Sequence, residues 1–373
     1  MKFKFHHNTL IIIIIAVITA LFLTILIVST YCCLRRRRRK GGEESGRKDL
    51  ERSRDSKIGE GLEKNRSSGE YFMRFEGGEN LSVEEILDAP GEVIGKSSYG
   101  TLYRAYLLHS NWFALLRFLR PTCSVSGEDD VLREVEVLGG VRHPNLVPLC
   151  AFYGGARGEK LMVHPFYRGG NLADFIRDGN VDAHKWPVIR AIALGIARGI
   201  YHLHTAFENP VIHGNLKSKN VFLDANHNPY VSDFGLHLLL TPSAGQEMLD
   251  ASMSNGYKPP ELIKMKDASE ESDVYSFGVI LLELLTGKEP IDKNPPRGHE
   301  SHLLDEASTA ILDDRVDPLF HPGIFSGLTD DERAVVRDRV FKFFQLAMAC
   351  CAATRLLRPH MKQVVDRLEE IGA

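Results

Sequence analysis

The pattern of apolar and polar positions changes along the chain. Leu10–Leu34 contains no charged side chain. From Gly41 to about Gly78 the residues are mainly Gly, Ser, Glu, Lys and Arg without apolar periodicity, which predicts a flexible tether. Beyond Leu81, short strand-like runs come first and helical patterns follow. The clearest are the runs Glu92–Ile94, Leu102–Leu107 and Ala114–Leu119 and the helical patterns Trp186–His204 and Asp273–Leu285. This order predicts an α+β unit with a small β-rich N-terminal lobe and a helical C-terminal lobe.

The apolar run is long enough to cross a membrane. As a helix, Leu10–Leu34 would be about 37 Å long, which exceeds the ~30 Å hydrocarbon core of a bilayer. A cleaved signal peptide is the alternative, with Lys2 and Lys4 as its basic start, but its apolar core would be only about 7–15 residues long. The basic run that follows predicts that everything C-terminal to it lies in the cytosol. That run consists of Arg35, Arg36, Arg37, Arg38, Arg39 and Lys40.

Charge and cysteine content exclude some classes of protein. The formal net charge is -3, which argues against a nucleic-acid partner because phosphate neutralisation needs a basic surface. The basic run is expected to attract anionic membrane lipid, although a stop-transfer role is sufficient to account for it and is the favoured interpretation. None of the six cysteines has CxxC spacing, so we expect reduced thiols. Cys32 and Cys33 either carry palmitoyl groups or simply end the spanning helix.

Seven motifs appear along the second part of the chain in a specific order. They are Ile94–Ala105, Glu134–Leu149, His213–Asn220, Asp233–Gly235, Gly256–Glu261, Asp273–Gly278 and Arg358–Met361. Together they resemble a protein kinase, and residues ~85 to 370 resemble the cytosolic domain of plant leucine-rich-repeat receptor-like kinases. No leucine-rich-repeat ectodomain is expected. The resulting segments are a short extracytoplasmic N-terminus (1–9), a transmembrane helix (10–34), a basic, flexible juxtamembrane tether (35–84) and a kinase-like domain (85–370).

The resemblance implies a nucleotide slot, but several of its residues depart from the family pattern. Gly95 and Gly100 match the first and third glycines of the phosphate-covering loop, Ser97 replaces the second, and Leu102 stands at the position of the following valine. Leu115 and Phe222 stand where smaller residues usually contact the two faces of the adenine ring. Both substitutions add volume to the slot.

Arg117 replaces the lysine that contacts the α- and β-phosphates and pairs with Glu134. Its planar guanidinium keeps the positive charge and can pair with Glu134. It is wide and forked, however, whereas the lysine ammonium places a compact charge on the phosphates.

The catalytic loop departs more strongly. The family motif H-R-D-L-K-x-x-N reads here as His213–Asn220, in which Asn215 stands at the position of the catalytic base. An amide has no titratable carboxylate, so a general-base contribution of typically 10²–10⁴-fold should be lost. Gly214 removes the arginine that would gather a phosphorylated activation segment. Lys217, Asn220 and Asp233 match the family, either as residual phosphate or Mg²⁺ contacts or as supports of the loop.

Other matching positions concern architecture. Leu138, Leu149, His213 and Phe234 match the family's hydrophobic spine, and Asp273 its anchor at the start of a helix. Glu261 and Arg358 match its buried ion pair. The sequence thus predicts a single-pass plasma-membrane pseudokinase that requires no cofactor, binds ATP and Mg²⁺ weakly or not at all, and acts with other membrane receptor kinases or cytosolic signalling proteins. A weakly active Ser/Thr kinase is the alternative, and an unrelated membrane adaptor would require the ordered motifs to be coincidence.

Overall fold

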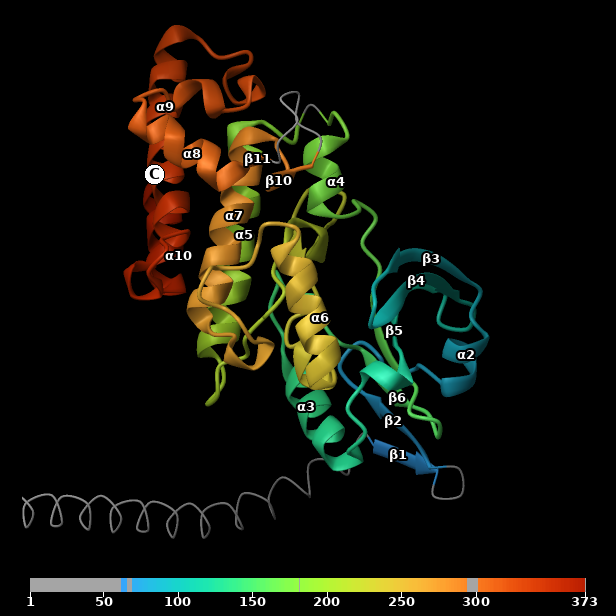
Figure 1. Ribbon diagram of the computed structural model, residues 1–373. Coiled ribbons are helices and arrows are strands. Elements are labelled where there is room, and N and C mark those ends of the chain that lie inside the picture. The colour runs from blue at the N-terminus through green and yellow to red at the C-terminus, as the bar shows by residue number, and fades with distance from the viewer. Residues whose placement is uncertain (1–61, 66–68, 181, 294–300, 373) are drawn as a thin grey trace, which may run out of the picture. The chain divides into compact units, whose positions relative to one another are not determined.

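The described residues form a sheet followed by a helical region. The computed structural model describes residues 62–65, 69–180, 182–293 and 301–372. Nearly all of them belong to one compact unit, Glu63–Ala373. Within this unit the seven-stranded sheet and the long helices α5 (Trp186–Thr205), α7 (Glu270–Thr286) and α9 (Asp330–Cys350) lie in different lobes (Figure 1), so the expected α+β arrangement is confirmed.

The N-terminal lobe is built on a seven-stranded sheet in the order β1-β2-β6-β7-β5-β4-β3. Its strands are β1 (Leu62–Asn65), β2 (Glu70–Arg74), β3 (Gly91–Lys96), β4 (Gly100–Leu107), β5 (Trp112–Leu119), β6 (Ala151–Gly154) and β7 (Lys160–Pro165). Each predicted strand run lies inside β3, β4 or β5. Because β5 pairs with β4 on one side and β7 on the other, its middle residues are buried and Arg117 is held in a fixed place.

The folded region begins earlier than the sequence analysis places it. The tether was expected to extend to residue 84, whereas β2 pairs with β6 inside the sheet and α2 (Val83–Asp88) packs beside it. Tyr71, Phe72 and Met73 of β2 are buried. The average composition of the polar segment hides this short apolar run, which is long enough for a strand because strands need only about five residues.

The C-terminal lobe is organised around two long helices. Its elements are α4 (Leu172–Arg177), α5 (Trp186–Thr205), α6 (Pro242–Met253), α7 (Glu270–Thr286), α8 (Leu303–Leu312), α9 (Asp330–Cys350), α10 (Met361–Glu370) and the hairpins β8 (Val221–Leu223) with β9 (Pro229–Val231) and β10 (Ile291–Asp292) with β11 (Ser301–His302). The two predicted helical patterns coincide with α5 and α7. Residues Ser272–Thr286 of α7 are all buried, as expected for a helix apolar on every side.

The predicted membrane span cannot be followed in the fold. Leu10–Leu34 lies outside the described residues, as do the basic run, the N-terminal nine residues and Cys32 and Cys33. Among the helices of the part that is described, none combines the length and apolarity needed to cross a bilayer.

The architectural matches are found where the sequence analysis expects them. Leu138, Leu149, His213 and Phe234 are all buried. Arg358 forms a bidentate ion pair with Glu261, with N–O distances of 2.6 and 2.8 Å, and its side chain is fully buried. The four described cysteines are free thiols, and the described residues contain no His, Cys, Asp and Glu cluster that could hold a metal ion.

Candidate active site

Five segments bring the sequence-predicted residues together between the lobes. The β3–β4 hairpin carries Gly95 to Gly100, and β5 carries Arg117. The loop between α5 and β8 carries Asn215, and Asp233 follows β9. Helix α3 (Glu128–Gly140) carries Glu134.

Arg117 pairs with Asp233. An Arg117 guanidinium nitrogen donates to an Asp233 carboxylate oxygen at 2.6 Å, and the two side chains are only 10% and 8% exposed. Asp233 adopts a left-handed backbone conformation with φ 63°, which is uncommon for a non-glycine residue. The carboxylate that the family uses for metal is therefore occupied by a cation of the chain itself.

The prediction that Arg117 pairs with Glu134 is wrong. Among the described residues Glu134 makes no ion pair with Arg117, and it lies half-buried on α3. Burial raises the pKa of the Glu134 carboxyl. The family motif predicts a carboxylate near residue 117, but both Glu134 and Asp233 meet that description. Arginine is longer than the family's lysine, and here it bonds to Asp233.

Tyr99, at the tip of the glycine-rich hairpin, is a site residue that the sequence analysis missed. It is only 6% exposed although it lies in a turn. Its hydroxyl lies near the side chains of Ser97 and Asn215 and near the Arg117–Asp233 pair, and burial together with the Asp233 charge raises its pKa. The motif accepts any residue at this position, so the only signal in the sequence was an aromatic residue between Gly95 and Gly100.

The catalytic loop is buried and internally bonded. Asn215 is 2% exposed, and neither polar atom of its amide makes a hydrogen bond to a described group. The Asn220 amide donates to the Asn215 carbonyl at 2.9 Å, so it supports the loop. Lys217 lies close to Asp233 and Arg117, and burial lowers the pKa of its ammonium group while Asp233 opposes the shift.

Asp273 anchors this loop from below. Its carboxylate accepts the backbone N–H groups of His213 and Gly214 at 2.7 and 2.9 Å and bonds to Nε2 of His204 at 3.0 Å. Gly214 has φ 73°, a conformation that side chains rarely adopt. His237 Nδ1 occupies the space next to it, 2.8 Å from where a Cβ would lie.

The residues that would line the adenine slot are large and packed. Leu115 is 2% exposed and lies opposite His164 of β7. The Phe222 ring stacks on Tyr167 with centroids 6.3 Å apart. Gly100 is required by the packing of the backbone, independently of phosphate binding, because a Cβ there would lie 2.3 Å from the Phe118 carbonyl oxygen. Gly95 is less constrained, because its Cβ would only contact that of Leu102 at 3.6 Å.

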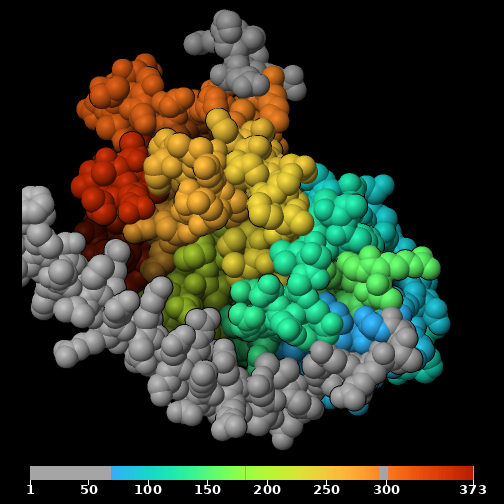
Figure 2. Space-filling model, turned by 60° about the horizontal axis from the view of Figure 1, so that its bottom comes forward, coloured from blue at the N-terminus to red at the C-terminus, as the bar shows by residue number. Residues whose placement is uncertain are grey.

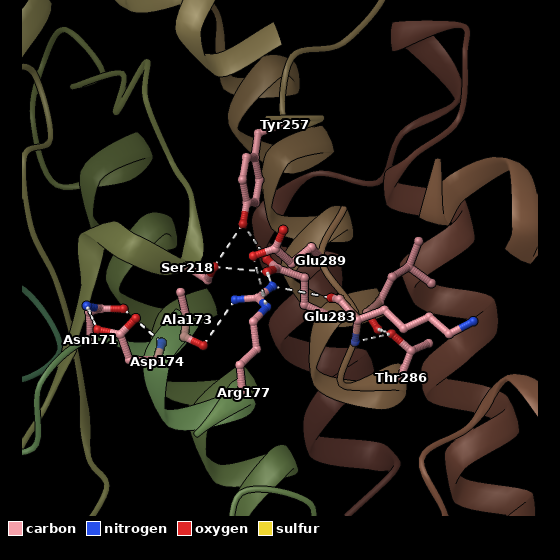
Figure 3. A network of polar contacts seen from close by, with 11 residues as sticks. Asn171, Ala173, Asp174, Arg177, Ser218, Tyr257, Glu283, Thr286 and Glu289 are labelled. Carbon is pink, nitrogen blue, oxygen red and sulfur yellow. Dashed lines mark hydrogen bonds and ion pairs between the residues drawn. The ribbon is translucent and has the colours of Figure 1, made fainter. Parts of the chain in front are cut away.

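A buried polar network lies beneath the catalytic loop (Figure 3). Glu283 of α7 is fully buried, and its carboxylate accepts hydrogen bonds from Arg177, from Ser218 at 3.0 Å and from Tyr257 at 2.7 Å. The Arg177 guanidinium also donates to the Ala173 carbonyl at 3.0 Å. Burial raises the pKa of Glu283, and Arg177 opposes that shift. The network joins α4, the catalytic loop, the end of the activation segment and α7.

The two lobes, the glycine-rich hairpin, the catalytic loop and the Asp-Phe-Gly turn define a protein kinase domain. The family model of that name matches residues 89–367, and the chain belongs to this family. Its relatives include the kinase-like protein TMKL1 of Arabidopsis thaliana, 39% identical over 79% of this chain and 43% of the relative. Another Arabidopsis relative, IMK3, is named as a leucine-rich-repeat receptor-like protein kinase and is 37% identical over 82% of this chain and 37% of the relative. The chain thus spans less than half of TMKL1. Three further Arabidopsis relatives, each 34% identical, are named as inactive receptor kinases.

Two solved structures are similar to this one. The kinase domain of maize SIRK1 bound to AMP-PNP has a TM-score of 0.70 at 30% identity, covering 81% of this chain and all of that one. The pseudokinase domain of BIR2, described as an immune regulator, has a TM-score of 0.61 at 27% identity, covering 79% of this chain and 83% of that one. The fold therefore occurs in relatives both with a bound ATP analogue and with a pseudokinase description.

Proposed function

We propose that this chain is a receptor-like pseudokinase that signals by protein–protein interaction without efficient phosphoryl transfer. The observation that carries the proposal is the buried Arg117–Asp233 ion pair. To bind Mg²⁺, Asp233 would have to release Arg117, which would leave a buried guanidinium without its counter-charge. Breaking a buried pair in this way typically costs about 3–5 kcal/mol.

The space for the nucleotide phosphates is also reduced. Tyr99 is buried against the ion pair and the catalytic loop, where the family's glycine-rich loop would cover phosphate. Large side chains fill the adenine side, and overpacking of a site typically costs about 1–3 kcal/mol. These residues do not fit a Mg²⁺–nucleotide complex, so we assign no step of the function to one.

We expect ATP to bind the full chain with a dissociation constant in the millimolar range, which corresponds to a binding free energy of about -4 kcal/mol. Mg²⁺ should not strengthen this binding. A thermal-shift titration with submillimolar ATP, with and without Mg²⁺, should therefore show little stabilisation in either case, whereas a ligand at 100 times its dissociation constant adds about 2.7 kcal/mol. Leu115→Ala should restore part of the binding. Low-micromolar, Mg²⁺-dependent binding by the wild-type chain would contradict the proposal.

A weakly active Ser/Thr kinase is the second candidate. Lys217 and Asp233 lie close together in the structure, as phosphate and metal contacts would require. The chemistry of Asn215 is unfavourable to it, because an amide cannot accept the hydroxyl proton.

The proposed setting is the plasma membrane, with the kinase-like domain in the cytosol. The basic run would contact anionic lipid, and the partners would be other membrane receptor kinases or cytosolic signalling proteins. The receptor-like relatives support this setting, and so does the apolar run Leu10–Leu34.

A fluorescent protein fused after Ala373 should localise to a membrane and resist external protease in intact cells, because the positive-inside rule places the C-terminal part in the cytosol. Deletion of residues 1–34 should release the fusion into the soluble fraction. A secreted product shortened at its N-terminus would support the signal-peptide alternative instead.

A further inference from the structure

The start of the activation segment is hydrogen-bonded to the N-terminal lobe. Ser124, in the linker 120–127 between β5 and α3, forms an isolated antiparallel bridge with Leu240. The Val125 N–H donates to the Leu239 carbonyl at 3.1 Å, and the Thr241 N–H donates to the Cys123 carbonyl at 2.8 Å. In Figure 2 the yellow atoms of the activation segment meet the teal atoms of the linker and α3 at the surface.

The same linker is attached on its other side to the glycine-rich hairpin. The Arg120 N–H donates to the Tyr99 carbonyl at 2.9 Å. Lys160 of β7 fixes the middle of the linker, because its ammonium donates to the Ser124 hydroxyl at 3.0 Å while its side chain is buried. Tyr99, the linker and the activation segment are thus joined by successive hydrogen bonds.

We propose that the linker 120–127 is a strap that couples the glycine-rich hairpin to the activation segment and thereby holds Tyr99 in the cleft. The proposal rests on the proposed function, since it describes how the cleft of a non-transferring domain stays closed. Opening the hairpin requires the Arg120–Tyr99 bond to break or the linker to move with it. Movement of the linker strains its bonds to Leu239 and Thr241, so loosening one end should loosen the other.

Two positions allow single hydrogen bonds of the strap to be removed without backbone strain. Arg120 has φ -64° and Thr241 has φ -60°, both close to the value that proline imposes. The residues before them are extended, as proline requires. Proline removes the N–H donor, whereas Arg120→Ala and Thr241→Ala remove the same side chains and keep it. The alanine variant at 241 also controls for loss of the helix cap, in which the Thr241 hydroxyl accepts from the Ala244 N–H.

The experiment is hydrogen exchange of the full chain in detergent micelles, read at the end of the strap far from each substitution. Arg120→Pro should accelerate exchange in α6 about fivefold relative to Arg120→Ala, the effect expected from one lost hydrogen bond. Thr241→Pro should accelerate exchange in residues 96–101 by a similar factor relative to Thr241→Ala. Amides of α7 should remain unchanged and report on global stability.

If each proline accelerates exchange only at its own end, the strap does not couple the two segments and the inference is overturned. Should a proline variant fail to fold, Lys160→Met tests the same point, because removal of the central hydrogen bond should accelerate exchange at both ends. A phosphotransfer assay on the wild-type chain separates the two claims. Phosphoryl transfer by the wild-type chain would contradict the proposed function. The hydrogen-exchange results test only whether the strap couples the two segments.

Discussion

Asn215→Asp is expected to leave phosphoryl transfer below detection, as in the wild-type chain, whereas Arg117→Lys combined with Asn215→Asp should raise it by about 10²–10⁴-fold. A general base accelerates transfer only once metal and phosphate are in position. The single variant keeps Arg117, which in the wild-type chain donates to Asp233 at 2.6 Å. A lysine presents a compact charge with no fork to hold the carboxylate, so the double variant should free Asp233 for Mg²⁺.

The measurement is incorporation of ³²P from labelled ATP into the full chain and into a generic Ser/Thr substrate. Adding Asp233→Ala to the double variant is the control, and it should abolish any gain. Transfer by the wild-type chain that Asp233→Ala removes would show that the chain is a slow kinase. Detectable transfer by the Asn215→Asp variant, equal to that of the double variant, would show that the ion pair is no obstacle.

Arg177→Met should lower the free energy of unfolding by about 3–5 kcal/mol, because it leaves the fully buried Glu283 carboxylate without its cationic partner. Ser218 and Tyr257 would still donate to this carboxylate (Figure 3), but neutral donors do not balance its charge. Urea unfolding followed by tryptophan fluorescence measures the change.

Arg198→Met is the matched control, since Arg198 pairs with Glu369 where both side chains are about half exposed. It should cost less than about 1 kcal/mol. In Arg177→Met combined with Glu283→Gln, part of the lost stability should return because no uncompensated charge stays buried. A cost equal to that of Arg198→Met would mean that the Arg177–Glu283 pair contributes nothing beyond a surface contact.

The pattern of apolar and polar positions was enough to predict the two lobes and the two principal helices, because burial sets that pattern. The Glu261–Arg358 ion pair was predicted from the resemblance, because the family motifs specify both residue types. The partner of Arg117 could not be predicted in this way, because choosing between Glu134 and Asp233 depends on where α3 lies. Tyr99 was missed for a related reason, since its burial depends on the position of the hairpin above the catalytic loop. The start of the fold was misplaced because β2 contributes only five residues to a largely polar stretch.

The packing around Gly214 restricts which side chains this position can accept. An arginine at this position would require both His237 and Met265 to shift, because a Cβ there would lie 2.8 Å from His237 Nδ1 and 2.6 Å from Met265 Cε. The backbone also has φ 73°, so any side chain would be strained. Replacing His237 alone would remove one of these contacts but leave the Met265 contact and the backbone strain. An activation segment gathered by an arginine here would therefore need changes at more than one position.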